Sequence, residues 1–325
     1  MKYPSLKKII QPNMALISLL IPVYLISWVL NYIYLPDFQN YTAARFRIQE
    51  VNPLWLTLSV LFITVFNILL IIQINSKYSI IRSKSFLPVF FFALFISAWK
   101  ESHLLWLSHL ALSAFLISLM LFLGMYRNRK AVEPAFVGSL LMSLTGYINP
   151  VYLFFIPVTW MGFIILKCFS ARVFFASLFG YIAPWIYYFS YKLFMGNDMP
   201  LFENLFFEFQ PYILFTDRAV YEQIYIAATV LTLILALIGT YSNMLNDAIQ
   251  TRKNIHLVLL FLVFLVLLVL SFAKHALAFM PFIAFCLAML LSHPFTLNKS
   301  KLYPVLFIVY CLLNVTYMFF NYFTF

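Results

Sequence analysis

The sequence predicts an all-α protein built as a polytopic bundle of transmembrane helices, and two observations carry this prediction. The chain of 325 residues is 64% hydrophobic and only 10% charged, with a mean hydropathy of +0.95. A water-soluble domain contains about 45–50% apolar and about 25% charged residues. The apolar residues also form repeated runs of about 18 or more, each long enough to cross a hydrocarbon core of about 30 Å. Soluble enzymes, secreted disulfide scaffolds and disordered chains are therefore excluded.

The apolar runs and the polar residues between them predict eleven spans within a single integral membrane domain, 1–325. The spans are 14–34, 53–73, 86–99, 104–125, 135–148, 151–168, 173–194, 223–242, 255–272, 276–293 and 303–323. Two of them are short, and each is followed almost at once by another span, which indicates tight turns at one membrane face. The first run lacks a small-residue cleavage pattern, so we expect it to be retained as a span.

The basic residues predict the orientation of these spans, because Lys and Arg collect in loops that stay in the cytoplasm. With the N-terminus inside, the inner segments hold 15 of the 21 basic residues and the outer segments hold 6. We therefore predict a cytoplasmic N-terminus and an external C-terminus. This distribution also explains the net charge of +11 without a nucleic-acid partner.

The acidic residues have a distribution that the orientation rule does not require. Eight of the ten fall in predicted outer segments: Asp37, Glu50, Glu101, Asp198, Glu203, Glu208, Asp217 and Glu222. One interpretation is that acids avoid the inner loops because bases fill them. The other is that the outer side carries an acidic working face.

The first predicted outer loop, 35–52, contains Asp37, Arg45, Arg47 and Glu50. A carboxylate here is suited to act as a general base on an acceptor hydroxyl. The two arginines are suited to bind a phosphate through paired N–H groups. The alternative is an interfacial amphipathic segment, in which the arginines meet lipid headgroups and Asp37 caps a helix.

The tight outer turn between the third and fourth predicted spans reads Trp99-Lys-Glu-Ser-His103. Charged residues in such a short turn at membrane depth are costly unless they pair or line a wet cavity. Glu101 lies on the same predicted face as Asp37, as a membrane-embedded cleft requires. The alternative is that Lys100 and Glu101 are simply interfacial.

A third basic position closes the most hydrophobic run of the chain, 257–273, where Lys274 and His275 precede Met280-Pro281. A cation there is suited to bind a lipid-linked phosphate at the outer interface. The alternative is a lysine that marks the end of a span by extending its amine to the interface. The three cysteines and five histidines are scattered, so the sequence indicates no metal site.

The most distinctive pattern lies in residues 138–196. It consists of Gly138-Ser-Leu-Leu-Met-Ser-Leu-Thr-Gly-Tyr-Ile-Asn-Pro150, then Pro157, a basic turn at Lys167 and Arg172, Gly180, Pro184-Trp185 and Gly196. This order resembles the middle of GT-C membrane glycosyltransferases, where a Gly-containing short span, a turn, a Pro-bearing span, a basic loop and a Pro-Trp span follow one another. The stretch from Lys274 to Pro281 is similar to the basic-then-proline span that this family often carries late in its core.

The resemblance implies a GT-C-like core at about 14–194, with additional spans at 223–323. It further implies a glycosyltransferase of cell-envelope assembly that uses a polyprenyl-phosphate-linked sugar on the outer face. The family's acid in the first outer loop is matched by Asp37 or Glu50, and its second acid after the third span is matched by Glu101. The lipid phosphate would then meet the basic side chains Arg45, Arg47, Lys274 and His275. Whether a divalent metal takes part is left open.

The chain as a whole also resembles a family of multi-pass inner-membrane proteins from Bacteroidota, through 75–88 and 133–196. This likeness implies a bacterial inner-membrane location, with membrane lipids, a lipid-linked sugar and an envelope acceptor as partners. The chain has no Asp-x-Asp pair, which favours an alternative: a non-catalytic membrane subunit, or a carrier of lipid or polymer, with a membrane protein partner. A secondary transporter is less favoured, because paired repeats with broken spans are not found.

Overall fold

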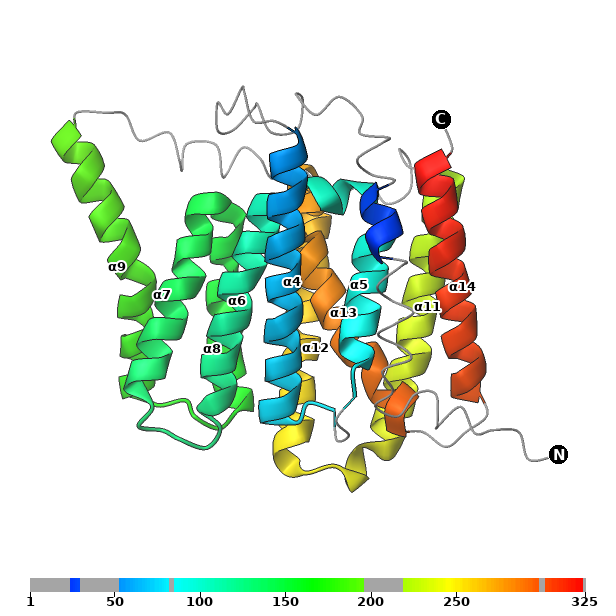
Figure 1. The fold of residues 1–325 in the computed structure, drawn as a ribbon. Helices are drawn as coiled ribbons and strands as arrows, with labels where there is room; N and C mark the ends of the chain where they lie inside the picture. Colours follow the sequence, from blue (N-terminus) through cyan, green and yellow to red (C-terminus); the bar gives the residue numbers. More distant parts are fainter. Residues whose placement is uncertain (1–23, 30–52, 82–84, 196–218, 298–301, 324–325) are drawn as a thin grey trace. The chain divides into compact units, whose positions relative to one another are not determined.

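A computed structural model of the chain describes residues 24–29, 53–81, 85–195, 219–297 and 302–323 (Figure 1). Within these ranges the chain folds entirely as helices and their connections, which confirms the predicted all-α architecture. Seven helices are long and apolar enough to cross a membrane: Thr57–Tyr78, Trp106–Gly124, Ala171–Met195, Val220–Asn246, Ile249–Ser271, Ala273–Leu297 and Leu302–Phe323. The chain is therefore a helical protein of the multi-pass membrane type.

Three further apolar helices are shorter: Leu87–Ala98, Val132–Ile148 and Pro150–Ile165. The first has 12 residues, which gives a length of about 18 Å at about 1.5 Å per residue. A hydrocarbon core is about 30 Å thick, so this helix does not cross it alone. The prediction of eleven spans, with its orientation, therefore stays a prediction.

The chain divides into two compact units, each assembled from separate stretches of sequence. The first unit comprises residues 1–109, 215–247 and 280–325, and the second comprises 110–214 and 248–279. Both units take residues from inside and outside the range 14–194. The single integral domain with a GT-C-like core in that range stays a prediction.

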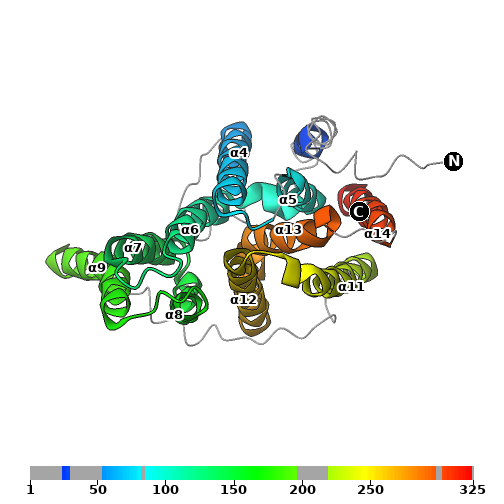
Figure 2. The same ribbon diagram turned by 90° about the horizontal axis from the view of Figure 1, so that it is seen from below.

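The first unit is organised around a short central helix, α5. Its elements are α4 (Pro53–Tyr78), α5 (Leu87–Ala98), η1 (Lys100–Leu104), α11 (Val220–Asn243), η3 (Met244–Asn246), α13 (Met280–Leu297) and α14 (Leu302–Phe323). Every residue of α5 is buried, and α5 packs against α4, α13 and α14 (Figure 2). Its Phe91 ring lies 5.5 Å from Phe295 and 5.7 Å from Phe307. Because α5 is enclosed by protein, its short length exposes no backbone end to lipid.

The second unit has an aromatic core between its helices. Its elements are the part of α6 (Trp106–Gly124) that follows His109, α7 (Val132–Ile148), η2 (Pro150–Phe154), α8 (Phe155–Ile165), α9 (Ala171–Met195), α12 (Ile249–Ser271) and η4 (Ala273–Phe279). The Phe115 ring lies 5.0 Å from Phe261 and 5.7 Å from Phe155. These contacts join α6, α8 and α12.

Helices α7 and α9 make the most extensive contact of the second unit, and small residues permit it (Figure 2). A Cβ atom added at Gly180 would lie 2.4 Å from the carbonyl oxygen of Phe136. The Ser143 hydroxyl donates to the carbonyl oxygen of Tyr181 at 2.6 Å and accepts from Trp185 Nε1 at 2.9 Å. Close backbone approach with hydrogen bonds from small polar side chains is typical of helix pairs in membranes.

Candidate functional site

The turn between α5 and α6 folds as the 3-10 helix η1, which carries Glu101 and His103. Ser102 fixes this turn, because its hydroxyl lies 2.7 Å from the carbonyl oxygens of both Ile96 and Trp99. Carbonyl groups at the end of a helix lack partners within the helix and need such a donor. The serine therefore closes the end of α5 and positions the titratable residues on either side of it.

Two histidines, His103 of this turn and His109 of α6, are buried in the first unit. His103 is fully buried, with its ring centroid 4.5 Å from that of Trp28. Neither ring nitrogen of His103 has a hydrogen-bond partner among the described residues. His109 Nε2 lies 3.0 Å from the carbonyl oxygen of Ser102, so this nitrogen carries the proton and donates. Asn67 Nδ2 donates to the carbonyl oxygen of His109 at 3.0 Å, which ties α4 to α6.

The electrostatics of the turn keep His103 uncharged. Burial, with a smaller contribution from the neighbouring His109, lowers the pKa of His103 to about 3. The protonated imidazole is disfavoured because it would lose its hydration without gaining a counter-charge. At neutral pH the side chain therefore presents one lone pair and one N–H group inside the protein.

Glu101 lies next to these histidines, at the end of α14. Its side chain is half-buried, and its Oε2 atom is enclosed by protein. Asn321 Nδ2 donates to the carbonyl oxygen of Ala98 at 3.1 Å and holds α14 against the end of α5. We call Glu101, His103 and His109 the η1 cluster.

The structure brings only some of the sequence-predicted site residues into view. Asp37, Arg45, Arg47 and Glu50 lie outside the described residues. Glu101 belongs to the first unit, whereas Lys274 and His275 belong to the second. The convergence of these acids and bases in one cleft stays a prediction.

Lys274 and His275 have different environments in η4. The Lys274 side chain is exposed, whereas His275 is buried. His275 Nδ1 lies 3.0 Å from Nδ2 of Asn149, so the ring nitrogen accepts from the amide. Tyr152 donates its hydroxyl to the carbonyl oxygen of Ala278 at 2.9 Å. His275 thus helps to fasten η4 to the α7–η2 junction. Lys274 is the exposed residue of the two, so an anion can reach its amine.

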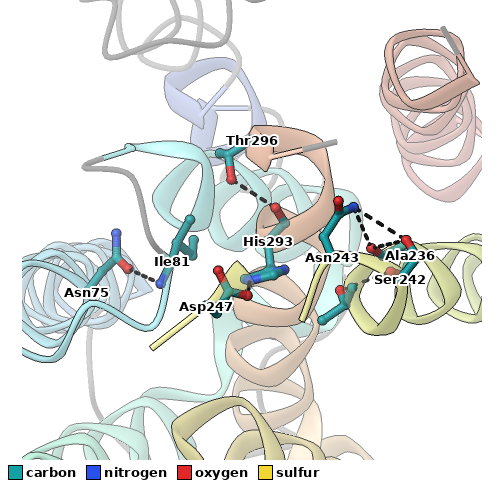
Figure 3. Close-up of polar contacts among 10 residues, drawn as sticks. Asn75, Ile81, Ala236, Ser242, Asn243, Asp247, His293 and Thr296 are labelled. Atoms are coloured by element: carbon teal, nitrogen blue, oxygen red, sulfur yellow. Dashed lines mark hydrogen bonds and ion pairs between the residues drawn. The ribbon is translucent and has the colours of Figure 1, made fainter. Parts of the chain in front are cut away.

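The structure reveals one polar pair that the sequence interpretation did not select as a site. Asp247, which follows η3, lies with its Oδ2 atom 3.0 Å from Nε2 of His293 on α13 (Figure 3). Both side chains are 1% exposed. The remaining Asp247 oxygen and His293 nitrogen have no hydrogen-bond partner among the described residues. The available signal was a histidine inside an apolar span together with an acid in an inner loop, since ionisable groups within spans seldom occur without a partner.

The described residues contain no group of three or more His, Cys, Asp or Glu side chains that could hold a metal ion. A scan against protein-family models and searches of curated proteins and solved structures find no significant match to this chain.

Proposed function

We propose that the chain is a GT-C-like glycosyltransferase of cell-envelope assembly, which uses a polyprenyl-phosphate-linked sugar on the outer face of a bacterial inner membrane. The observation that supports the proposal best is the η1 cluster, which places three titratable side chains inside a mostly apolar bundle. Groups of this kind in membrane proteins mark functional sites far more often than exposed ones do. In the proposed orientation of eleven spans, with the N-terminus in the cytoplasm, this cluster lies at the outer face.

The proposed reaction moves a sugar from the lipid phosphate to a hydroxyl of an envelope acceptor. The acceptor oxygen attacks the anomeric carbon, the bond between that carbon and the phosphate oxygen breaks, and polyprenyl phosphate leaves. Asp37 or Glu50 takes the proton of the acceptor hydroxyl as general base. Glu101 is the supporting acid beside the reacting groups.

The leaving phosphate gains charge in this step and needs cations placed in advance. Arg45 and Arg47 of the first outer loop, together with Lys274 of η4, are the basic side chains proposed for this role. Fixed positive groups aimed at a developing negative charge lower the barrier because they need no reorganisation during the reaction. Lys274 is exposed and therefore accessible to such a ligand.

The test is the replacement of the two candidate bases by their amides, Asp37→Asn and Glu50→Gln. We expect at least one change to reduce sugar transfer by about 10²–10⁴-fold, the usual contribution of a general base, while the protein still inserts into the membrane. The measurement is complementation of a deletion strain, with the amount of inserted protein determined in parallel. Glu133→Gln is the matched control, because Glu133 is an exposed acid at the start of α7. Full complementation by both amide variants would refute the enzymatic proposal.

A non-catalytic subunit, or a carrier of lipid or polymer, is the second candidate function. An apolar groove between α7 and α9 favours it, because such a groove accepts a lipid chain without any chemistry. This candidate predicts co-purification with a stable membrane partner and full function of the Asp37→Asn variant. The glycosyltransferase predicts the opposite result for that variant.

A further inference from the structure

Residues of α7 and α9 line an open groove of about 530 Å³ within the second unit. Its walls are almost entirely apolar in surface and consist chiefly of Leu140, Leu144, Tyr147, Tyr187, Tyr188 and Tyr191. Known small-molecule sites have volumes of about 300–1,000 Å³. The groove is therefore large enough to hold a ligand, and it is too large to be a packing defect.

The groove originates in the geometry of the two helices. They touch at Gly180, where a Cβ atom would already collide with the backbone of α7. One turn later Pro184 lies inside α9, where it removes a backbone hydrogen bond and bends the helix. Figure 1 shows the two helices together at one end and α9 leaning away from α7 at the other. The tyrosines occupy the space that this divergence opens.

The groove faces lipid in a chain of this type. Its wall α9 is one of the helices long and apolar enough to cross a membrane, and Tyr187 on that wall is 82% exposed. Tyrosine is enriched where a membrane helix meets the headgroup layer. The tyrosines lie near the C-terminal ends of α7 and α9, so this end of the groove is expected at the interface.

Helix α9 carries a lysine at the same end. Lys192, in the last turn of α9, places its Nζ atom 6.0 Å from the centre of the Tyr188 ring. Helix α9 contains no acidic residue, and the one acid of α7, Glu133, lies in its first turn at the opposite end. Among the described residues of α7 and α9, the charge at this end is therefore positive, which complements a phosphate.

We propose that the groove between α7 and α9 binds one anionic phospholipid, with an acyl chain against Leu140 and Leu144 and the phosphate at Lys192. An acyl chain suits the apolar walls of the groove, and the headgroup phosphate accounts for the cation near them.

The proposal is tested on the full chain, purified in detergent, delipidated and titrated with phosphatidylglycerol or phosphatidylcholine under native mass spectrometry. We expect the unsubstituted protein to prefer phosphatidylglycerol by about 5-fold, the effect of one lysine near an anionic lipid. Lys192→Gln is expected to abolish this preference. Arg172→Gln, which removes an exposed base at the opposite end of α9, is expected to retain it.

A second variant tests binding of the acyl chain separately from binding of the headgroup. Ala183→Phe fills the groove, and we expect it to lose both lipids, with its helical content by circular dichroism unchanged. Equal binding of the two lipids by the unsubstituted protein would overturn the proposal, as would a preference that survives in Lys192→Gln. Displacement of phosphatidylglycerol by equimolar polyprenyl phosphate would also overturn it, because the groove would then be a substrate site. This outcome does not depend on Asp37 or Glu50, so it is distinguishable from failure of the proposed reaction.

Discussion

Replacing His293 with leucine is expected to lower the free energy of unfolding by about 1–3 kcal/mol, the usual loss when a buried polar group is left without its hydrogen-bond partner. His293 Nε2 lies 3.0 Å from Asp247 Oδ2, and both side chains are 1% exposed. The substitution keeps a helix-forming side chain in α13 but leaves the Asp247 carboxylate buried without this neighbour. Hydrogen bonds between membrane helices average only about 0.6 kcal/mol, so a loss of about 1–3 kcal/mol would report the burial of the unpaired Asp247 carboxyl group rather than the hydrogen bond alone.

The double variant Asp247→Ala/His293→Leu isolates this interaction. Removing the stranded carboxylate is expected to restore most of the lost stability, because apolar replacement of a whole buried pair is often neutral. The measurement is reversible unfolding by SDS in mixed micelles. His256→Leu serves as the control, because His256 on α12 is only partly buried. If the loss of unfolding free energy in the double variant equals the sum of the losses in the two single variants, the assignment of the two residues as a pair is contradicted.

The second large effect is expected at Glu101. The variant Glu101→Gln keeps the size of the side chain and removes its charge at the turn that also holds His103. We expect a decrease in kcat/KM for sugar transfer of about 10²-fold, which corresponds to about 2.7 kcal/mol of transition-state stabilisation. The measurement is the transfer of labelled sugar from a polyprenyl-phosphate donor in reconstituted vesicles.

The control for Glu101 is a half-buried acid elsewhere on the predicted outer side. Glu222, in the first turn of α11, meets this description, and Glu222→Gln is expected to retain near-normal activity. Equal activity of the Glu101→Gln variant and the unsubstituted protein would remove Glu101 from the proposed site. A comparable loss of activity in Glu101→Gln and Glu222→Gln would show that activity depends in general on negative charge on the outer side.

Hydropathy predicted the helices well because each apolar run must be helical to satisfy its backbone in lipid. Their ends were less predictable. The ninth span was expected at 255–272, whereas α12 begins at Ile249 and ends at Ser271. Its first five residues include Gln250, Arg252 and Lys253, which are polar but good helix formers. Hydropathy marks the apolar part of a helix, and the helix itself continues beyond it.

Tertiary contacts were not predictable from the same patterns. The Asp247–His293 pair joins residues 46 positions apart, and the Asn149–His275 contact joins residues 126 positions apart. Local periodicity carries no information on which helices meet, so neither pair followed from the sequence. Lys274 and His275 were both predicted as phosphate ligands, which stays a prediction, and the fold adds that His275 is buried with its Nδ1 atom accepting from Asn149. Lys274 is exposed and His275 is buried, and only the fold reveals this difference between the two neighbours.

The central claim is that the candidate site faces the outside of the membrane. It is tested most directly by single cysteines labelled with a membrane-impermeant thiol reagent in intact cells. The exposed Lys274 and Lys130 are the positions to replace, with the unsubstituted chain as background because Cys168 and Cys286 are buried and Cys311 is partly buried. The account predicts that Lys274→Cys reacts in intact cells and that Lys130→Cys reacts only after permeabilisation. The reverse pattern would contradict it.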